Sequence, residues 1–133
     1  MQVLAQAQRL PKVTNKLEVA LFLMPAPVQE QGERPYFPYN LLFVESESRM
    51  VVSTEVLAPL PSLEAMWARV PLTVVQKLLE IGVMPQEIDV SSPQLQHLLG
   101  TLQPDLGFQV KRKRRLPALD QARRAMERFM RQM

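Results

Sequence analysis

Five consecutive cations, Lys111 to Arg115, stand near the end of the chain between Val110 and Leu116. Ammonium groups attract phosphate, and guanidinium groups bind phosphate with two parallel donors. More arginines follow within twenty residues, so the basic character continues past the run. The candidate contacts for the phosphates of a nucleic acid are Lys111, Arg112, Lys113, Arg114, Arg115, Arg123 and Arg124.

The same run has two interpretations that do not involve nucleic acid. Cations on an edge strand protect its unpaired backbone from a second chain, and a short basic segment can also act as a nuclear-import signal. Import signals usually lie in flexible segments, whereas this run precedes a predicted helix. Edge protection needs one or two cations, so the surplus favours a partner. The only aromatic residue after the run, Phe129, is expected to face inward, which leaves phosphate contacts without base stacking.

The charge of the chain is strongly asymmetric. Residues 111–133 hold nine Lys or Arg against two acids, a net of +7, while residues 1–110 hold seven against eleven, a net of −4. The formal net charge of +3 therefore conceals a basic end on an acidic remainder. Such a basic end attracts phosphate and also promotes solubility, so charge alone does not choose between these roles.

Other patterns that carry chemistry are not present. Cysteine is absent, which excludes disulfides, thiolate metal sites and thiol catalysis. His97, the only histidine, has no metal-ligating or acid–base spacing near it, and Ser91-Ser92 is explained by helix capping. The glycines never cluster into a phosphate-binding or dinucleotide loop, so no cofactor is expected. Trp67 falls on an apolar helix face and is expected in the core.

The length of 133 residues is typical of one domain with a core of its own. We expect an N-terminal extension over residues 1–16 and a single domain over residues 17–133. The longest apolar run, Val19 to Met24, is far too short to span a bilayer, and the N-terminus lacks the apolar core of a signal peptide. We therefore expect a cytoplasmic protein that does not bind a membrane.

Hydrophobic periodicity predicts five strands and three helices. The strands are expected over residues 17–24, 39–44, 50–57, 88–90 and from 108 to 116. The helices are expected after Ser62, after Ser92 and from Pro117, and Pro71 should kink or restart the first of them. Runs of strands followed by helix–strand alternation predict an α/β fold with a mixed five-stranded sheet and helices on both faces. Its predicted core includes Leu21, Phe22, Leu41, Phe43, Val52 and Val90.

The order strand, strand, strand, helix, strand, helix, strand, helix resembles the ribonuclease H-like core of transposases and retroviral-type integrases. The segments that carry the resemblance are YNLLFVE at 39–45, RMVVSTEVL at 49–57 and MPQEIDVSS at 84–92. It covers about residues 17–130, and the chain also looks like a bacterial family of uncharacterised domains built on this plan. The resemblance implies a ribonuclease H-like fold.

Active enzymes of that core hold two divalent metals with acids on the first strand, at the end of the fourth strand and on a late helix. Here the middle of the first strand has no acid, and Ser91-Ser92 stands where an aspartate is expected, with Asp89 in an opposite or displaced orientation. Serine is a poor ligand for hard divalent cations, so the resemblance implies a catalytically inactive pseudoenzyme with no metal site. A rearranged metal set of Glu18, Asp89 and Asp120 is the remaining enzymatic interpretation.

We therefore expect a binding or scaffolding module that contacts nucleic acid weakly and without sequence preference through its basic end. The alternative is a protein-interaction module, in which the helix from Ser62 to Ile81 or the loop from Pro25 to Pro38 docks a protein partner or a second copy. The third interpretation is a metal-dependent nuclease.

Overall fold

The computed structural model describes residues 2–29, 31–32 and 34–132, and in this part of the chain five strands form one mixed sheet. The strands are β1 (Lys16–Leu23), β2 (Tyr39–Glu45), β3 (Val51–Leu57), β4 (Glu87–Val90) and β5 (Gln109–Arg112). Their order across the sheet is β3-β2-β1-β4-β5, with antiparallel pairing from β3 to β1 and parallel pairing from β1 to β5. The predicted five-stranded mixed sheet is confirmed.

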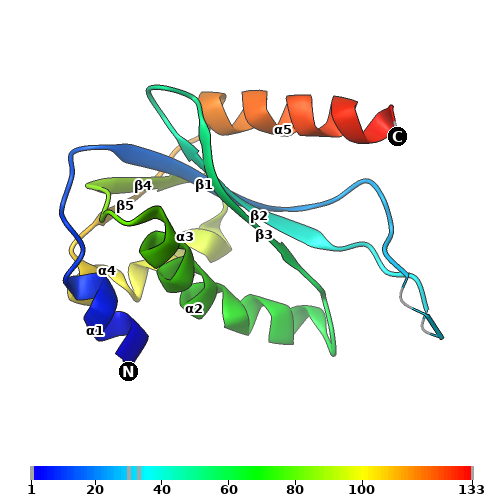
Figure 1. Ribbon diagram of the computed structural model, residues 1–133, viewed down its shortest axis with the longest axis horizontal. Coiled ribbons are helices and arrows are strands. Elements are labelled where there is room, and N and C mark those ends of the chain that lie inside the picture. Colours follow the sequence, from blue (N-terminus) through cyan, green and yellow to red (C-terminus); the bar gives the residue numbers. More distant parts are fainter. Residues whose placement is uncertain (1, 30, 33, 133) are drawn as a thin grey trace.

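Helices cover both faces of the sheet, as predicted (Figure 1). They are α1 (Gln2–Gln8), α2 (Leu63–Ile81), α3 (Pro93–Gly100), α4 (Gln103–Leu106) and α5 (Pro117–Arg131). Helix α5 lies alone on one face, here named the α5 face, and the other four lie on the opposite face, the α2 face. The order of elements is the expected one with α1 and α4 added.

Strand alternation divides the core between these two faces. On the α2 face a large cluster includes Leu41, Phe43 and Val90, and on the α5 face a smaller one includes Phe22 and Leu42. Four of the six predicted core residues are buried. The other two, Leu21 and Val52, are only partly buried and pack against the rim of the larger cluster.

Helix α2 runs through Pro71 as one element and does not restart there. Ser62 accepts a hydrogen bond from the Ala65 backbone N–H at 3.0 Å, and Gly82 ends the helix with a φ of 89°. The proline removes one backbone donor, but the buried side chains on either side of it, including Val70 and Val74, fix both halves against the sheet.

Residues 2–16, within the segment expected as an N-terminal extension, pack onto the domain. Ala7 of α1 is fully buried in the α2-face core. Further along, the Val13 backbone N–H donates to the Met84 carbonyl at 3.0 Å, and the Met84 N–H donates to the Pro11 carbonyl at 2.8 Å. These bonds attach the segment to the residues that lead into β4.

At the C-terminal end, β5 is an edge strand as expected, but it ends at Arg112 and not at residue 116. The prediction that Phe129 faces inward was wrong, because this side chain is 65% exposed. The last apolar residue of α5 that packs against the sheet is Met126, so the helix continues beyond the surface that it covers. None of the helices in the described part of the chain is long and apolar enough to cross a lipid bilayer.

Candidate anion-binding site

The basic run divides into two groups because β5 alternates its side chains between the two sheet faces. Lys111 lies beside Asp89 in the parallel register of β4 and β5, whereas Arg112 lies beside Val90, whose side chain is in the α2-face core. Lys111 and Arg112 are therefore directed to opposite faces, and the contact of Lys113 with Asp89 places Lys113 on the side of Lys111.

Three acids lie on the α5 face of the two central parallel strands. Glu18 of β1 pairs in register with Asp89 of β4, and Glu87 precedes Asp89 by two residues. All three are buried. Their strand neighbours Leu17, Val19, Ile88 and Val90 belong to the opposite core, so alternation directs the acids toward α5.

Two of these acids are paired with lysines. Lys113 Nζ lies 3.0 Å from Asp89 Oδ2 and 3.5 Å from Glu87 Oε2, and Lys111 Nζ lies 3.0 Å from Glu87 Oε1. Lys16 Nζ adds a longer contact of 3.9 Å to Glu87 Oε1. We name these five residues the acid–lysine cluster. The carboxylates are buried while about half of each lysine side chain remains exposed, so the ammonium groups lie at the solvent boundary.

The two carboxyl groups of the cluster have opposite pKa shifts. Burial, followed by hydrogen bonding to Glu87, raises the pKa of Asp89 to about 6. Hydrogen bonding from Asp89 and the neighbouring Lys111 lower the pKa of Glu87 to about 2. Among the described residues neither Glu87 Oε2 nor Asp89 Oδ1, both buried, accepts a hydrogen bond, although Lys113 Nζ forms an ion pair with Glu87 Oε2 at 3.5 Å. When Asp89 is protonated its hydroxyl can donate to Glu87, so the pair shares one proton more readily than two separate carboxylates would.

Glu18 has a structural role beside this cluster. Its Oε1 accepts a hydrogen bond from the Leu119 backbone N–H at 3.0 Å, in the first turn of α5. Leu116, at the N-cap position, provides no side-chain hydrogen bond. Glu18 therefore caps α5 from a neighbouring strand and satisfies one of the free N–H groups of its first turn.

Most of the remaining predicted phosphate contacts, which are all arginines, do not pair with acids. In the described residues Arg112, Arg114, Arg115 and Arg124 are exposed and have no acidic partner. We name them the unpaired arginines. Arg123 lies 4.4 Å above the centre of the Phe22 ring, and its Nε is 3.0 Å from Glu127 Oε1. It is thus engaged with the domain itself.

The rearranged metal set is only partly brought together. Glu18 and Asp89 are neighbours, while Asp120 lies in the first turn of α5, one residue after the capped Leu119. Within residues 2–29, 31–32 and 34–132 no three acids, histidines or cysteines are arranged to hold a metal ion. His97 is exposed on α3.

Glu87 and Lys16 were missed by the sequence analysis, although the sequence contains a signal for the cluster. Two acids at 87 and 89 and two lysines at 111 and 113 have the spacing that places each pair on one face of a strand. On adjacent parallel strands these pairs meet.

Comparison with known protein families identifies the family to which the chain belongs. The model of the family described as Domain of unknown function (DUF6930) matches residues 3–127, and the chain therefore belongs to this family. No curated protein matches the chain.

Proposed function

We propose that this DUF6930 domain is a catalytically silent ribonuclease H-like module that binds the phosphate backbone of nucleic acids through its unpaired arginines. The ribonuclease H-like assignment is supported by three antiparallel strands followed by two parallel strands, with helices in the connections. Function does not follow from such a fold, so the remaining argument rests on the side chains.

The observation that carries the proposal is the division of the basic run. Lys111 and Lys113 compensate buried acids, whereas Arg112 at the end of β5 and Arg114 and Arg115 just after it are exposed and have no acidic partner among the described residues. Three exposed guanidinium groups within four residues provide planar N–H donors, from which phosphate oxygens accept hydrogen bonds. Because phosphates carry no base information, binding should depend on charge and not on sequence.

Catalytic silence is supported by the acid–lysine cluster. In this cluster the ammonium of Lys113 contacts both Glu87 and Asp89, the two acids of β4 on the α5 face. A divalent cation would have to compete with this ammonium for both carboxylates, which opposes metal binding. We therefore propose that lysine takes the place of metal on this face.

Binding of a fluorescently labelled duplex of mixed sequence, followed by anisotropy at low salt, tests this proposal. We expect Arg112→Gln/Arg114→Gln to weaken binding several-fold for every duplex sequence alike. The charge-matched control Arg9→Gln/Arg34→Gln removes two exposed arginines distant from β5 in the sequence and should change the affinity little. If both variants lost the same amount of affinity, binding would depend on the net charge of the chain alone, and the assigned site would be refuted.

A further inference from the structure

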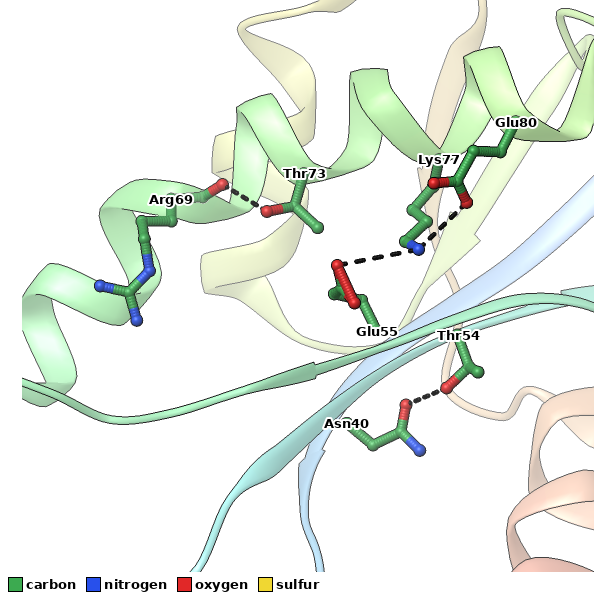
Figure 2. Close-up of polar contacts among 7 residues, drawn as sticks. All are labelled: Asn40, Thr54, Glu55, Arg69, Thr73, Lys77 and Glu80. Carbon is green, nitrogen blue, oxygen red and sulfur yellow. Dashed lines mark hydrogen bonds and ion pairs between the residues drawn. The ribbon is translucent and has the colours of Figure 1, made fainter. Parts of the chain in front are cut away.

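Phe129 presents an aromatic ring near the end of α5, where its side chain is 65% exposed. Three residues earlier in the helix, Met126 still packs on the α5 face, and Asn40 Nδ2 donates to its Sδ at 3.3 Å. Figure 2 shows the other end of this contact, in which Asn40 Oδ1 accepts from Thr54 Oγ1 at 2.6 Å. The turn that carries Phe129 therefore lies beyond the surface that covers the first part of the helix.

The helix surface beside this ring is basic. Arg124 and Arg128 are exposed and four residues apart, so they lie on the same side of α5, and Arg128 is adjacent to Phe129. Neither arginine has an acidic partner in the described part of the chain. The other unpaired arginines precede the first turn of α5. Guanidinium groups without an acid thus occur before the helix, in its middle and next to the ring.

The cations of α2, on the opposite face of the sheet, are engaged within the domain. Figure 2 shows Lys77 between two carboxylates, with its Nζ 3.7 Å from Glu55 Oε1 and 3.0 Å from Glu80 Oε2. The Arg69 guanidinium donates to two backbone carbonyls ahead of the helix, at 3.0 and 2.6 Å. The cations of α2 therefore have partners, and those of α5 are the ones available to an anionic ligand.

We infer that Phe129 stacks on a base of a single-stranded nucleic acid whose phosphates are bound by Arg128 and the unpaired arginines. This inference rests on the proposed phosphate binding and adds to it the class of nucleic acid. In a duplex each base is covered by its neighbours, whereas the unstacked bases of a single strand can meet an aromatic side chain. Such stacking tolerates any sequence, because every base has a π-face. The expectation of phosphate contacts without base stacking depended on an inward Phe129, and the exposed ring removes that premise.

The length of α5 is compatible with one short strand. Pro117 and Phe129 are about 18 Å apart along the helix axis, at a rise of roughly 1.5 Å per residue. At about 3.4 Å or more per nucleotide, about five nucleotides or fewer cover this distance. Single-strand binding folds have sites of roughly 4–16 nucleotides, so a strand of ordinary site length reaches both the ring and the arginines that precede the helix.

A lipid surface or a second copy of the chain is a less suitable occupant. Binding to either depends on the apolar area that is buried. The apolar residues earlier in α5, including Leu119 and Met126, already pack on the sheet and are not available for a second contact. One exposed ring between cations provides little apolar area but a complete stacking contact.

Anisotropy of a labelled oligothymidine of about ten nucleotides, measured beside the labelled duplex, tests the inference. Phe129→Ala should weaken binding of the single strand about five-fold or more and leave binding of the duplex unchanged. Phe129→Tyr keeps the ring and should retain the wild-type affinity. The control Leu72→Ala removes an apolar side chain that is 44% exposed on α2 and should bind both ligands like the wild type.

The double variant Arg112→Gln/Arg114→Gln separates this inference from the proposed function. If this variant binds both ligands like the wild type, the proposed phosphate site fails whatever the result for Phe129. If it binds weakly while Phe129→Ala binds the single strand normally, stacking is overturned and the phosphate site stands. Loss of self-association or of binding to anionic lipid vesicles in Phe129→Ala, with unchanged strand binding, would assign the ring to a second copy or to a membrane and also overturn stacking.

Phe129→Trp reports the contact directly. Stacking on a base quenches indole emission, so titration with the oligothymidine should lower the emission of this variant more than that of Leu72→Trp. The second variant carries its added indole on α2, on the opposite face of the sheet. Equal quenching in the two variants would contradict the assigned position of the strand.

Discussion

Lys113 Nζ lies 3.0 Å from Asp89 Oδ2, so a residue of the basic run neutralises a buried carboxylate on the neighbouring part of the sheet. The same ammonium lies 3.5 Å from Glu87 Oε2. Lysines and arginines of one run thus have different roles. The lysines pair with buried acids, and we propose that the arginines bind phosphate.

Removal of the lysine should destabilise the domain more than removal of an adjacent arginine. Lys113→Gln leaves Asp89 buried with a weaker partner, and we expect a loss of about 1–3 kcal/mol in the free energy of unfolding at pH 7. We expect the loss to lie at the lower end of this range, because Lys113 is half-exposed and solvent screens its ion pair with Asp89. Arg114→Gln, next to it and unpaired, should stay within about 0.5 kcal/mol of the wild type. Urea unfolding of the two variants measures this difference, and equal stabilities would contradict it.

Stability should rise as the pH falls from 7 toward 5. The pKa of Asp89 is raised from 3.8 to about 6, so in this window the folded chain binds a proton that the unfolded chain does not. The free energy of unfolding should increase by on the order of 1 kcal/mol between pH 7 and pH 5. Below about pH 4.5 the direction reverses, because the unfolded chain protonates Glu87 while the folded chain, with a pKa of about 2, does not.

Urea midpoints measured across this range check the pH dependence. Asp89→Asn should abolish the rise between pH 7 and 5, while Asp105→Asn, a substitution of an exposed aspartate, should keep it. A rise that persists in Asp89→Asn would assign the proton to a different group.

The contact between Glu18 and the Leu119 N–H predicts a graded effect of substitution. Glu18→Ala removes the acceptor and leaves the N–H of α5 unsatisfied, at an expected cost of about 1–3 kcal/mol. Glu18→Gln retains a carbonyl oxygen and should lose less than half of that amount. Denaturant unfolding separates the two variants. A Gln variant as unstable as the Ala variant would show that the charge of Glu18, and not its hydrogen bond, matters.

We predict no cleavage of DNA or RNA in the presence of magnesium or manganese. The physical reason is that Asp89 and Glu87 form ion pairs with lysines, so their carboxylates are not free to bind a metal ion. Incubation of a labelled duplex and single strand with purified chain and each metal tests this. Metal-dependent turnover that disappears in Asp89→Asn would overturn the proposal.

The sequence was sufficient to predict the five strands and the mixed sheet, though not the end of β5, because apolar patterns and proline or glycine boundaries are local signals. Phe43 and Val90, for example, lie in the predicted core. It was insufficient for α1, whose apolar residues are interrupted by glutamines and whose only buried residue is Ala7. Packing against α2 and α4 provides the stability that the helix pattern does not reveal.

The candidate site was harder to predict than the fold. The basic run is visible in the sequence, but its division into paired lysines and unpaired arginines depends on β4 lying beside β5, which is a contact between distant segments. Phe129 illustrates the opposite difficulty. Its spacing places it on the apolar side of α5, yet the sheet does not extend far enough to cover it.

The salt dependence of duplex binding tests the central claim most directly. For wild type the logarithm of the affinity should fall linearly with the logarithm of the salt concentration, with a slope of about 0.9 per neutralised phosphate. The double variant Arg112→Gln/Arg114→Gln should reduce the magnitude of this slope by nearly twice the contribution of one phosphate contact. The folded control Arg9→Gln/Arg34→Gln should keep the wild-type slope. A wild-type affinity that does not change with salt, or a slope unchanged by loss of the two arginines, would contradict phosphate binding at this site.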